Sequence, residues 1–114
     1  MSKIVQAINA MIANSGQISS VTPAQHNNSE YFFLYKNKYT WSISRNSNSE
    51  HRLYFYPSAK SVGHLPNFDE HDWENIPMVA YSDTEIATKE AKASFSELYT
   101  IIKEKIYGIS DVLD

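Results

Sequence analysis

The apolar and polar positions along the chain predict a short amphipathic helix at its N-terminal end. Apolar residues recur there at helical spacing: Ile4, Val5, Ile8, Met11 and Ile12. Ser2 precedes them as a good N-cap residue, and Ser15-Gly16 follows as a helix stop. The polar residues 17–29 then indicate a loop, with a brief extended piece at residues 18–21.

A longer helix is expected towards the C-terminal end. Ser82 and Glu85 have the spacing of a capping box, in which the serine oxygen accepts a hydrogen bond from an orphan amide and the glutamate reaches back. An apolar stripe follows at helical spacing: Ala87, Ala91, Phe95, Leu98, Ile102 and Ile106. Gly108 ends this helix. Three aliphatic side chains within residues 109–114 favour docking of the tail on the domain or on a partner subunit.

Three central runs rich in aromatic and β-branched residues predict an antiparallel meander over residues 31–35, 39–43 and 52–56. Residues 78–81 form a short fourth strand, and its leading Pro77 suits a strand start or an edge. Residues 57–77 are a long connection, which burial of Phe68 and Trp73 would hold against the body. The predicted fold is therefore α+β, with this sheet packed against a short N-terminal and a long C-terminal helix.

The register of the first hairpin decides which side chains each sheet face presents. A two-residue loop at 37–38 gives the pairs Lys36 with Tyr39, Leu34 with Trp41, Phe32 with Ile43 and Glu30 with Arg45. This register predicts a core face of Phe32, Leu34, Trp41 and Ile43. It also predicts that Thr40, Ser42 and Ser44 face outward.

On this register, large rings lie on the face opposite the core: Tyr31, Phe33 and Tyr35. The third strand adds either Tyr54 and Tyr56 or Leu53 and Phe55. Soluble monomers seldom leave a contiguous aromatic patch bare, so these rings need a cover. The candidates are the N-terminal helix, a second subunit or a ligand.

Composition places the chain among ordinary folded domains. Its 114 residues, with 42% hydrophobic and 20% charged, fit a single domain over residues 1–114. The absence of cysteine excludes disulfides, thiol nucleophiles and thiolate metal sites. Without an apolar run of about 20 residues or a secretory signal, a cytoplasmic location is expected and no membrane association.

Charge is distributed unevenly along the chain. The formal net charge of −3 argues against a nucleic-acid partner. Residues 31–60 nevertheless carry five cations and one acid, whereas residues 62–90 carry seven acids and one cation. Two solvated faces that attract each other, within the fold or across a dimer, account for this division. A basic face for an anionic ligand is the alternative.

Motifs for catalysis or metal binding are weak. The densest polar group offers nitrogen and oxygen ligands for zinc, manganese or non-haem iron: His64, Asp69, Glu70, His71, Asp72 and Glu74. The spacing of His64 and His71 matches no metal motif, so neither a metal site nor a cofactor is predicted. Acid–base chemistry by Glu50-His51 or by residues 69–71 stays open. Nucleophile elbows and phosphate loops are missing from the sequence, and no catalytic residue is predicted.

The sequence thus predicts a small non-catalytic binding domain that acts through protein–protein contact and forms a homodimer. The candidate binding residues are the rings and the neighbouring cations: Tyr31, Phe33, Tyr35, Tyr54, Tyr56, Lys36, Arg45 and Arg52. A small hydrolase or metalloprotein that uses the loop from His64 to Glu74 is one alternative. Single-strand nucleic-acid binding, with bases stacked on the aromatic face, is a second, which the net charge and element order disfavour.

Overall fold

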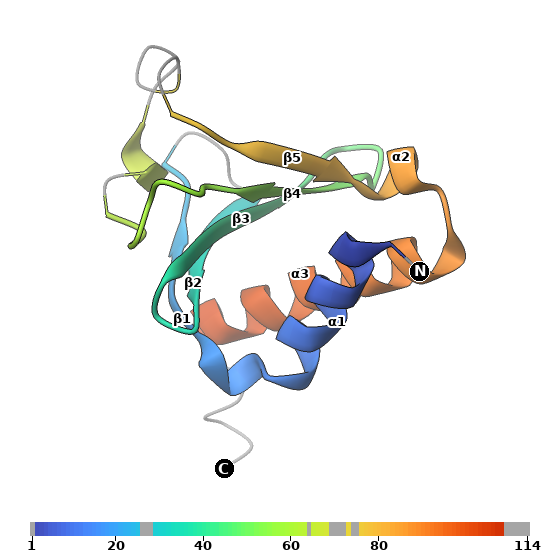
Figure 1. Ribbon diagram of the computed structural model, residues 1–114, viewed down its shortest axis with the longest axis horizontal. Helices are drawn as coiled ribbons and strands as arrows, with labels where there is room; N and C mark the ends of the chain where they lie inside the picture. The colour runs from blue at the N-terminus through green and yellow to red at the C-terminus, as the bar shows by residue number, and fades with distance from the viewer. Residues whose placement is uncertain (1, 26–28, 64, 69–72, 74–75, 109–114) are drawn as a thin grey trace.

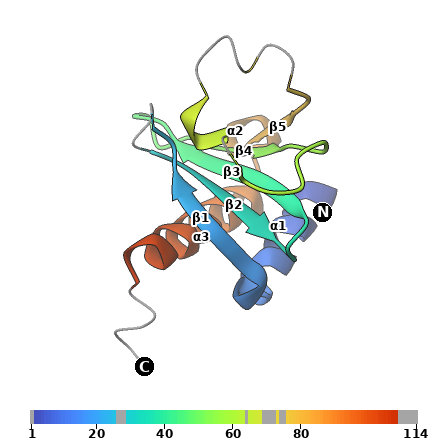
Figure 2. The same cartoon turned by 90° about the vertical axis from the view of Figure 1, so that its left-hand side faces the viewer.

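One antiparallel sheet of five strands forms the centre of the molecule. The computed structural model describes residues 2–25, 29–63, 65–68, 73 and 76–108. Helices lie against one face of the sheet, and the long connection between the last two strands lies against the other (Figures 1 and 2). The predicted α+β class is confirmed, with one strand more than expected.

The strands follow one another across the sheet in chain order. They are β1 (Ile18–Pro23), β2 (Glu30–Tyr35), β3 (Tyr39–Arg45), β4 (His51–Phe55) and β5 (Val79–Ser82). The brief extended piece expected near residue 18 is a complete edge strand, β1. Its pairing with β2 is interrupted between Ser19 and Thr22, where Ser20 has a φ of 54°. Such an irregularity bends an edge strand and weakens its use as a pairing template.

The N-terminal helix begins where the sequence predicts. The hydroxyl oxygen of Ser2 accepts a hydrogen bond from the Val5 backbone N–H at 3.2 Å, and α1 (Lys3–Ala13) follows. A short 3₁₀ turn (Ser15–Gln17) then leads directly into β1. The predicted N-cap is confirmed, because it supplies an acceptor for one of the amides that the first helical turn leaves unpaired.

The predicted long C-terminal helix consists of two helices. Ser82 caps α2 (Asp83–Ile86), which ends at Ala87 in the left-handed conformation with a φ of 62°. Thr88 then caps α3 (Lys89–Tyr107) by accepting from the Ala91 N–H at 3.0 Å. Gly108, with a φ of 67°, ends α3 as expected. The long helix is therefore α3, which begins at Lys89 and not directly after Ser82. The prediction of a single helix from Ser82 was wrong because the apolar stripe continues past Thr88, the N-cap of α3, without interruption.

The larger core lies between the sheet and the two longer helices, α1 and α3, which run beneath it (Figure 1). The sheet contributes Tyr31, Phe33, Tyr35, Ile43 and Leu53, and the helices contribute Ile8, Met11, Phe95, Leu98 and Ile102. Burial of these side chains joins both ends of the chain to its middle. None of the described helices is long and apolar enough to cross a membrane.

A second core lies on the opposite sheet face, beneath the connection from β4 to β5 (Figure 2). Phe32, Leu34 and Tyr56 pack there against Val62 and Leu65, with the 3₁₀ turn Leu65–Asn67 at its rim. Phe68, Trp73 and Ile76 pack against the same cluster. The prediction that Phe68 and Trp73 hold this connection by burial is confirmed. The tail 109–114, which was expected to dock, lies outside the described residues.

The predicted register of the β2–β3 hairpin is wrong by one residue. The pairs are Tyr35 with Tyr39, Leu34 with Thr40, Phe33 with Trp41, Phe32 with Ser42, Tyr31 with Ile43 and Glu30 with Ser44. The loop has three residues, 36–38, and Lys36 and Asn37 have φ values of 56° and 59°. Thr40 and Ser42 are consequently 0% exposed, where the sequence predicted outward-facing side chains.

The cause of this error is that both faces of β2 are covered. All five residues 31–35 are apolar and buried, so the alternation that normally fixes register is missing from this strand. The sequence predicted that the serine and threonine side chains of β3 face solvent, but the described part of the connection between β4 and β5 covers that face of the sheet.

Candidate functional site

The eight residues predicted for binding do not share one surface. Tyr31, Phe33 and Tyr35 lie under α1 and α3, only 5%, 0% and 8% exposed. Nucleic-acid stacking on this face depended on exposed rings, and the structure buries them. Tyr54 and Tyr56 lie on the opposite sheet face.

The predicted cations are also dispersed. Lys36 is exposed in the hairpin loop, with its Nζ 5.5 Å from the centroid of the Tyr35 ring. Arg45 donates to the Ser49 hydroxyl at 3.3 Å, and Arg52 pairs with Glu50 at 3.1 Å between Nε and Oε1. Four of the eight predicted residues line pockets: Tyr54 and Tyr56 on one side of the sheet, and Tyr31 and Arg45 on the other. The other four, Phe33, Tyr35, Lys36 and Arg52, line neither of these pockets.

The first pocket opens on the connection side of the sheet. Its cavity measures about 230 Å³ and is lined by Glu30, Ser44, Tyr54, Tyr56, Trp73 and Met78. It contains the predicted residues Tyr54 and Tyr56. Sequence reasoning missed Glu30 as a site residue because the wrong register paired it with Arg45. Trp73 comes from a connection whose path the sequence does not specify.

A chain of hydrogen bonds fixes the carboxylate of this pocket. The Ser42 hydroxyl donates to Glu30 Oε2 at 2.8 Å, and the Ser42 and Tyr56 hydroxyl oxygens are also 2.8 Å apart. Because Ser42 has a single proton and gives it to Glu30, Tyr56 must be the donor to Ser42. Burial raises the pKa of Glu30, and the hydrogen bond from Ser42 partly opposes this. Burial likewise raises the pKa of Tyr56.

The second pocket lies at the C-terminal end of α3, on the helix side of the sheet. Two adjoining hollows of about 400 and 470 Å³ share Arg45, Tyr99, Lys103 and Tyr107, and the larger one also reaches Tyr31. The predicted residues Tyr31 and Arg45 are therefore brought together here, by a helix that the sequence did not place against them. Two cations and three phenols line this pocket, and the carboxylate Glu104 also lines its smaller hollow.

The ionisation of Tyr31 depends on the other tyrosines of the second pocket. The rings of Tyr31 and Tyr99 are 5.7 Å apart, and the Tyr99 hydroxyl donates to the Ser29 carbonyl at 3.2 Å. Burial, together with repulsion from the Tyr99 and Tyr107 phenolates, raises the pKa of Tyr31 to about 12. The Tyr31 phenol is therefore a neutral hydrogen-bonding group at physiological pH.

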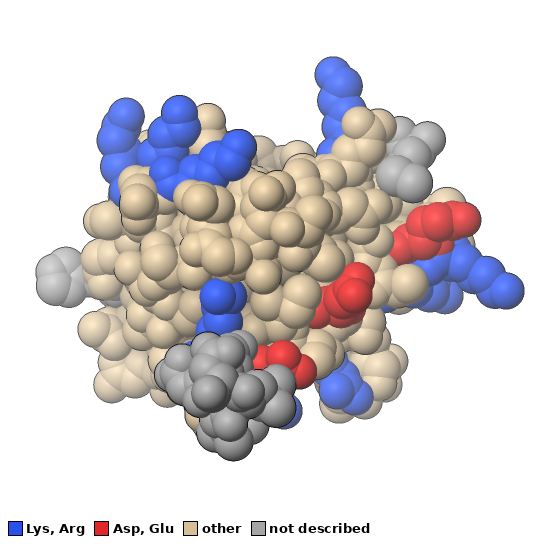
Figure 3. All heavy atoms as spheres, turned by 90° about the horizontal axis from the view of Figure 1, so that it is seen from below, with Lys and Arg blue, Asp and Glu red and all other residues tan. Residues whose placement is uncertain are grey.

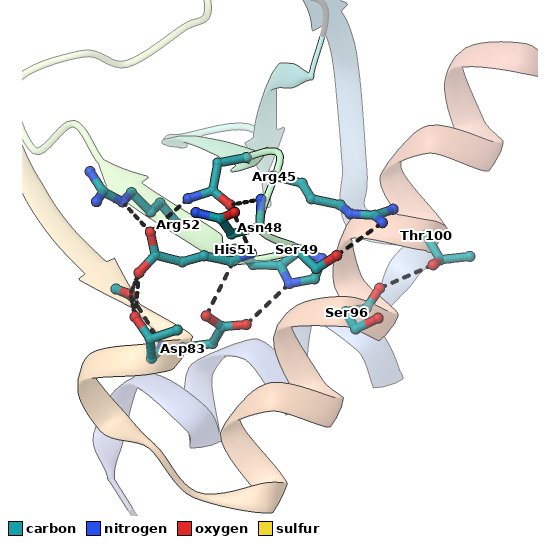
Figure 4. Close-up of polar contacts among 12 residues, drawn as sticks. Arg45, Asn48, Ser49, His51, Arg52, Asp83, Ser96 and Thr100 are labelled. Carbon is teal, nitrogen blue, oxygen red and sulfur yellow. Dashed lines mark hydrogen bonds and ion pairs between the residues drawn. The ribbon is translucent and has the colours of Figure 1, made fainter.

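His51, which the sequence offered for acid–base chemistry, forms a buried pair with Asp83 (Figure 4). Its Nδ1 lies 3.1 Å from Asp83 Oδ2, and its backbone N–H donates to Asp83 Oδ1 at 3.2 Å. Its ring packs edge-on against Tyr99 at 5.5 Å. The Glu50 carboxylate is not part of this pair and accepts hydrogen bonds from the side chains of Ser82, Thr84 and Arg52.

The His51–Asp83 pair connects β4 to α2, and its contacts are those of a structural interaction. Within the part of the chain that the structure describes, the His51 ring is not hydrogen-bonded to any serine or threonine hydroxyl. A nucleophile activated by this dyad is therefore not observed there. The described residues also contain no group of three side chains able to hold a metal ion. All six residues of the His64–Glu74 cluster lie outside them, so its role stays a prediction.

The outer edge of β5 is the more open of the two sheet edges. Met78 and Val79 are 37% and 43% exposed, and residues 78–82 carry no charge. Among described residues, no backbone hydrogen bond reaches this edge from outside the sheet. At the other edge, β1 has its irregularity at Ser20 and ends at Pro23.

The outer surface of the helix layer offers no comparable feature. Figure 3 shows that lysine and arginine side chains stand mostly around the margin of this face, with few charges in its middle. α1 carries one charged residue, Lys3, and its exposed positions are polar or small.

Comparisons of the chain with protein-family models, curated protein sequences and solved structures find no match.

Proposed function

We propose that the protein is a non-catalytic binding domain that acts through protein–protein contact, and that it forms a homodimer through the open edge of β5. The observation that carries this proposal is the contrast between the two sheet edges. Natural sheets protect their edges with charges, prolines and bulges. Neither edge strand carries a charge, but β1 has a bulge and ends at a proline, whereas β5 has neither and begins at the exposed Val79.

A second copy fits this edge because β5 can pair with itself. Two antiparallel β5 strands related by a two-fold axis would join the two sheets into one, and each would satisfy the other's outward backbone groups. Met78 and Val79 would add apolar area at the same contact. Because β5 has only four residues, this contact is expected to be weak, with a Kd of about micromolar or higher.

The experiment measures molar mass by sedimentation equilibrium over a range of protein concentrations. The unmodified chain is expected to dimerise, and Val79→Lys to weaken the dimer at least tenfold, because a charged side chain would replace an exposed apolar one on the edge strand. Ala93→Lys is the control, since it adds the same charge at an exposed position on α3. A strict monomer at about 100 µM would overturn the homodimer, as would equal effects of both variants.

A further inference from the structure

We propose that the pocket of Glu30, Tyr54, Tyr56 and Trp73 binds a substituted ammonium group. This site lies on the connection side of the sheet and shares only Met78 with the proposed dimer contact. Its ligand would be an organic cation, held by one carboxylate and several aromatic rings.

The first argument is an uncompensated carboxylate. All ten lysines and arginines lie in the described part of the chain, and none of them forms an ion pair with Glu30. Ser42 donates to Oε2, and within the described residues nothing donates to Oε1. Removing a carboxylate from water without pairing it with a cation destabilises the folded chain. An unpaired carboxylate in a pocket is therefore a candidate binding group, because a cationic ligand can supply the missing charge.

The second argument is the aromatic wall. Tyr54 and Trp73 are half-buried and line the cavity. Trp73 stacks on Tyr56, a lining residue that is only 2% exposed, with 5.6 Å between the ring centroids and an interplanar angle of 30°. Aromatic faces attract cations, and several faces around one carboxylate suit quaternary or alkylated ammonium groups. Met78 adds a polarisable thioether to the rim.

The third argument is preorganisation. Tyr56 donates to Ser42 and Ser42 donates to Glu30, so the carboxylate is held before any ligand arrives. Trp73 is held by Phe32, whose ring it parallels at 6.1 Å, and by Phe68. A site whose groups are already fixed loses little side-chain entropy on binding.

Charge and size narrow the ligand class. Arg52, two residues before Tyr54 in β4, pairs with Glu50 at 3.1 Å between Nε and Oε1. Glu30 repels anions, and a cavity of about 230 Å³ is smaller than the pockets that enclose drug-sized molecules. The pocket therefore fits a cationic head group, whether free or at the end of a partner's lysine side chain.

The test is a titration with tetramethylammonium chloride followed by ¹H–¹⁵N NMR at constant ionic strength. The expected result is saturable shift changes confined to the pocket residues, with a Kd of about 1 mM. tert-Butanol has the same number of heavy atoms around a tetrahedral centre without the charge, and it should bind at least tenfold more weakly. Equal affinity for the two probes, or shifts elsewhere only, would overturn the proposal.

Two variants separate the carboxylate from the aromatic wall. Glu30→Gln keeps an acceptor for Ser42 and should weaken tetramethylammonium binding at least tenfold. Glu97→Gln, at an exposed position of α3, is the control and should not change this binding. Tyr54→Leu keeps an apolar surface and should weaken binding about threefold or more. If Glu30→Gln does not fold, Tyr54→Leu alone decides, and unchanged affinity in it contradicts the proposal.

A further pair of probes distinguishes the source of the cation. Nα-acetyl-lysine methylamide carries an ammonium on a peptide-like frame, and it would bind more tightly than methylammonium if the natural ligand is a partner's side chain. The reverse order would indicate a small free cation. Val79→Lys should bind tetramethylammonium like the unmodified chain, so failure of the dimer and failure of this site are distinguishable.

Discussion

Thr40 is completely buried, and its hydroxyl has no hydrogen-bond partner among the described residues. A buried hydroxyl without a partner costs stability, and valine has nearly the same shape without it. Thr40→Val should therefore raise the free energy of unfolding by about 1 kcal/mol, measured by urea denaturation. Thr40→Ala is the control and should lower it, because it leaves a cavity. A loss of stability in Thr40→Val would show that the hydroxyl is satisfied.

Glu30 should make stability depend on pH in a defined direction. Burial raises its pKa above the usual 4.5, so the folded chain binds this proton more tightly than the unfolded chain does. Its favourable contribution is complete below pH 4.5 and is lost as the pH rises through the raised folded-state pKa. Glu30→Gln should thus increase the free energy of unfolding at pH 7, and this gain should disappear towards pH 4.

The measurement compares urea denaturation of the unmodified chain and of Glu30→Gln at several pH values. The difference between their free energies of unfolding cancels the contribution of the other titrating groups. Tyr56, the other titratable group in contact with the Ser42 hydroxyl, stays protonated over this range because burial raises its pKa. A gain that grows on acidification would contradict the argument.

Ala87 separates α2 from α3 in a left-handed conformation. This conformation costs a residue with a Cβ about 1 kcal/mol, and glycine avoids the cost. Ala87→Gly should therefore stabilise the chain by up to about 1 kcal/mol, measured by thermal unfolding. Ala93→Gly, in the middle of α3, should destabilise it by about as much, because glycine disfavours a helix interior. Effects of the same sign in both variants would contradict this assignment.

The elements themselves were largely predictable, because their signals are local. Ser2 and Gly108 mark helix ends through the backbone groups beside them, and the prediction holds at both positions. The break at Ala87 was missed although Thr88 is an ordinary N-cap residue. An apolar stripe continues across such a break when both helices pack on the same sheet, so periodicity alone does not reveal it.

The two cores of the molecule should respond differently to truncation. Phe33 is 0% exposed between the sheet and the helices, so Phe33→Ala should cost about 3–5 kcal/mol of global stability. Trp73 is half-buried and holds only the connection, so Trp73→Ala should mainly speed hydrogen exchange of amides such as Leu65 and Phe68. Amides in α3 serve as the internal control. Equal acceleration there would show that the two cores unfold as one.

The candidate sites were much less predictable than the elements. Tyr54 and Tyr56 do line a pocket, but Glu30 and Trp73 reach it from segments far away in the sequence. The same holds for Tyr31 and Arg45, which meet Tyr99 and Lys103 of α3. Periodicity along one chain carries no information on which distant segments lie over a sheet face.

The sequence by itself determined the class of fold, the order of its elements and most helix ends, because these follow from local periodicity and from capping of nearby backbone groups. Only the tertiary structure decided the hairpin register, the burial of Tyr31, Phe33 and Tyr35 beneath the helices, and the pocket around Glu30. The physical reason is that β2 is apolar at every position from 31 to 35. Its two faces become distinct only when the helices cover one and the β4–β5 connection covers the other.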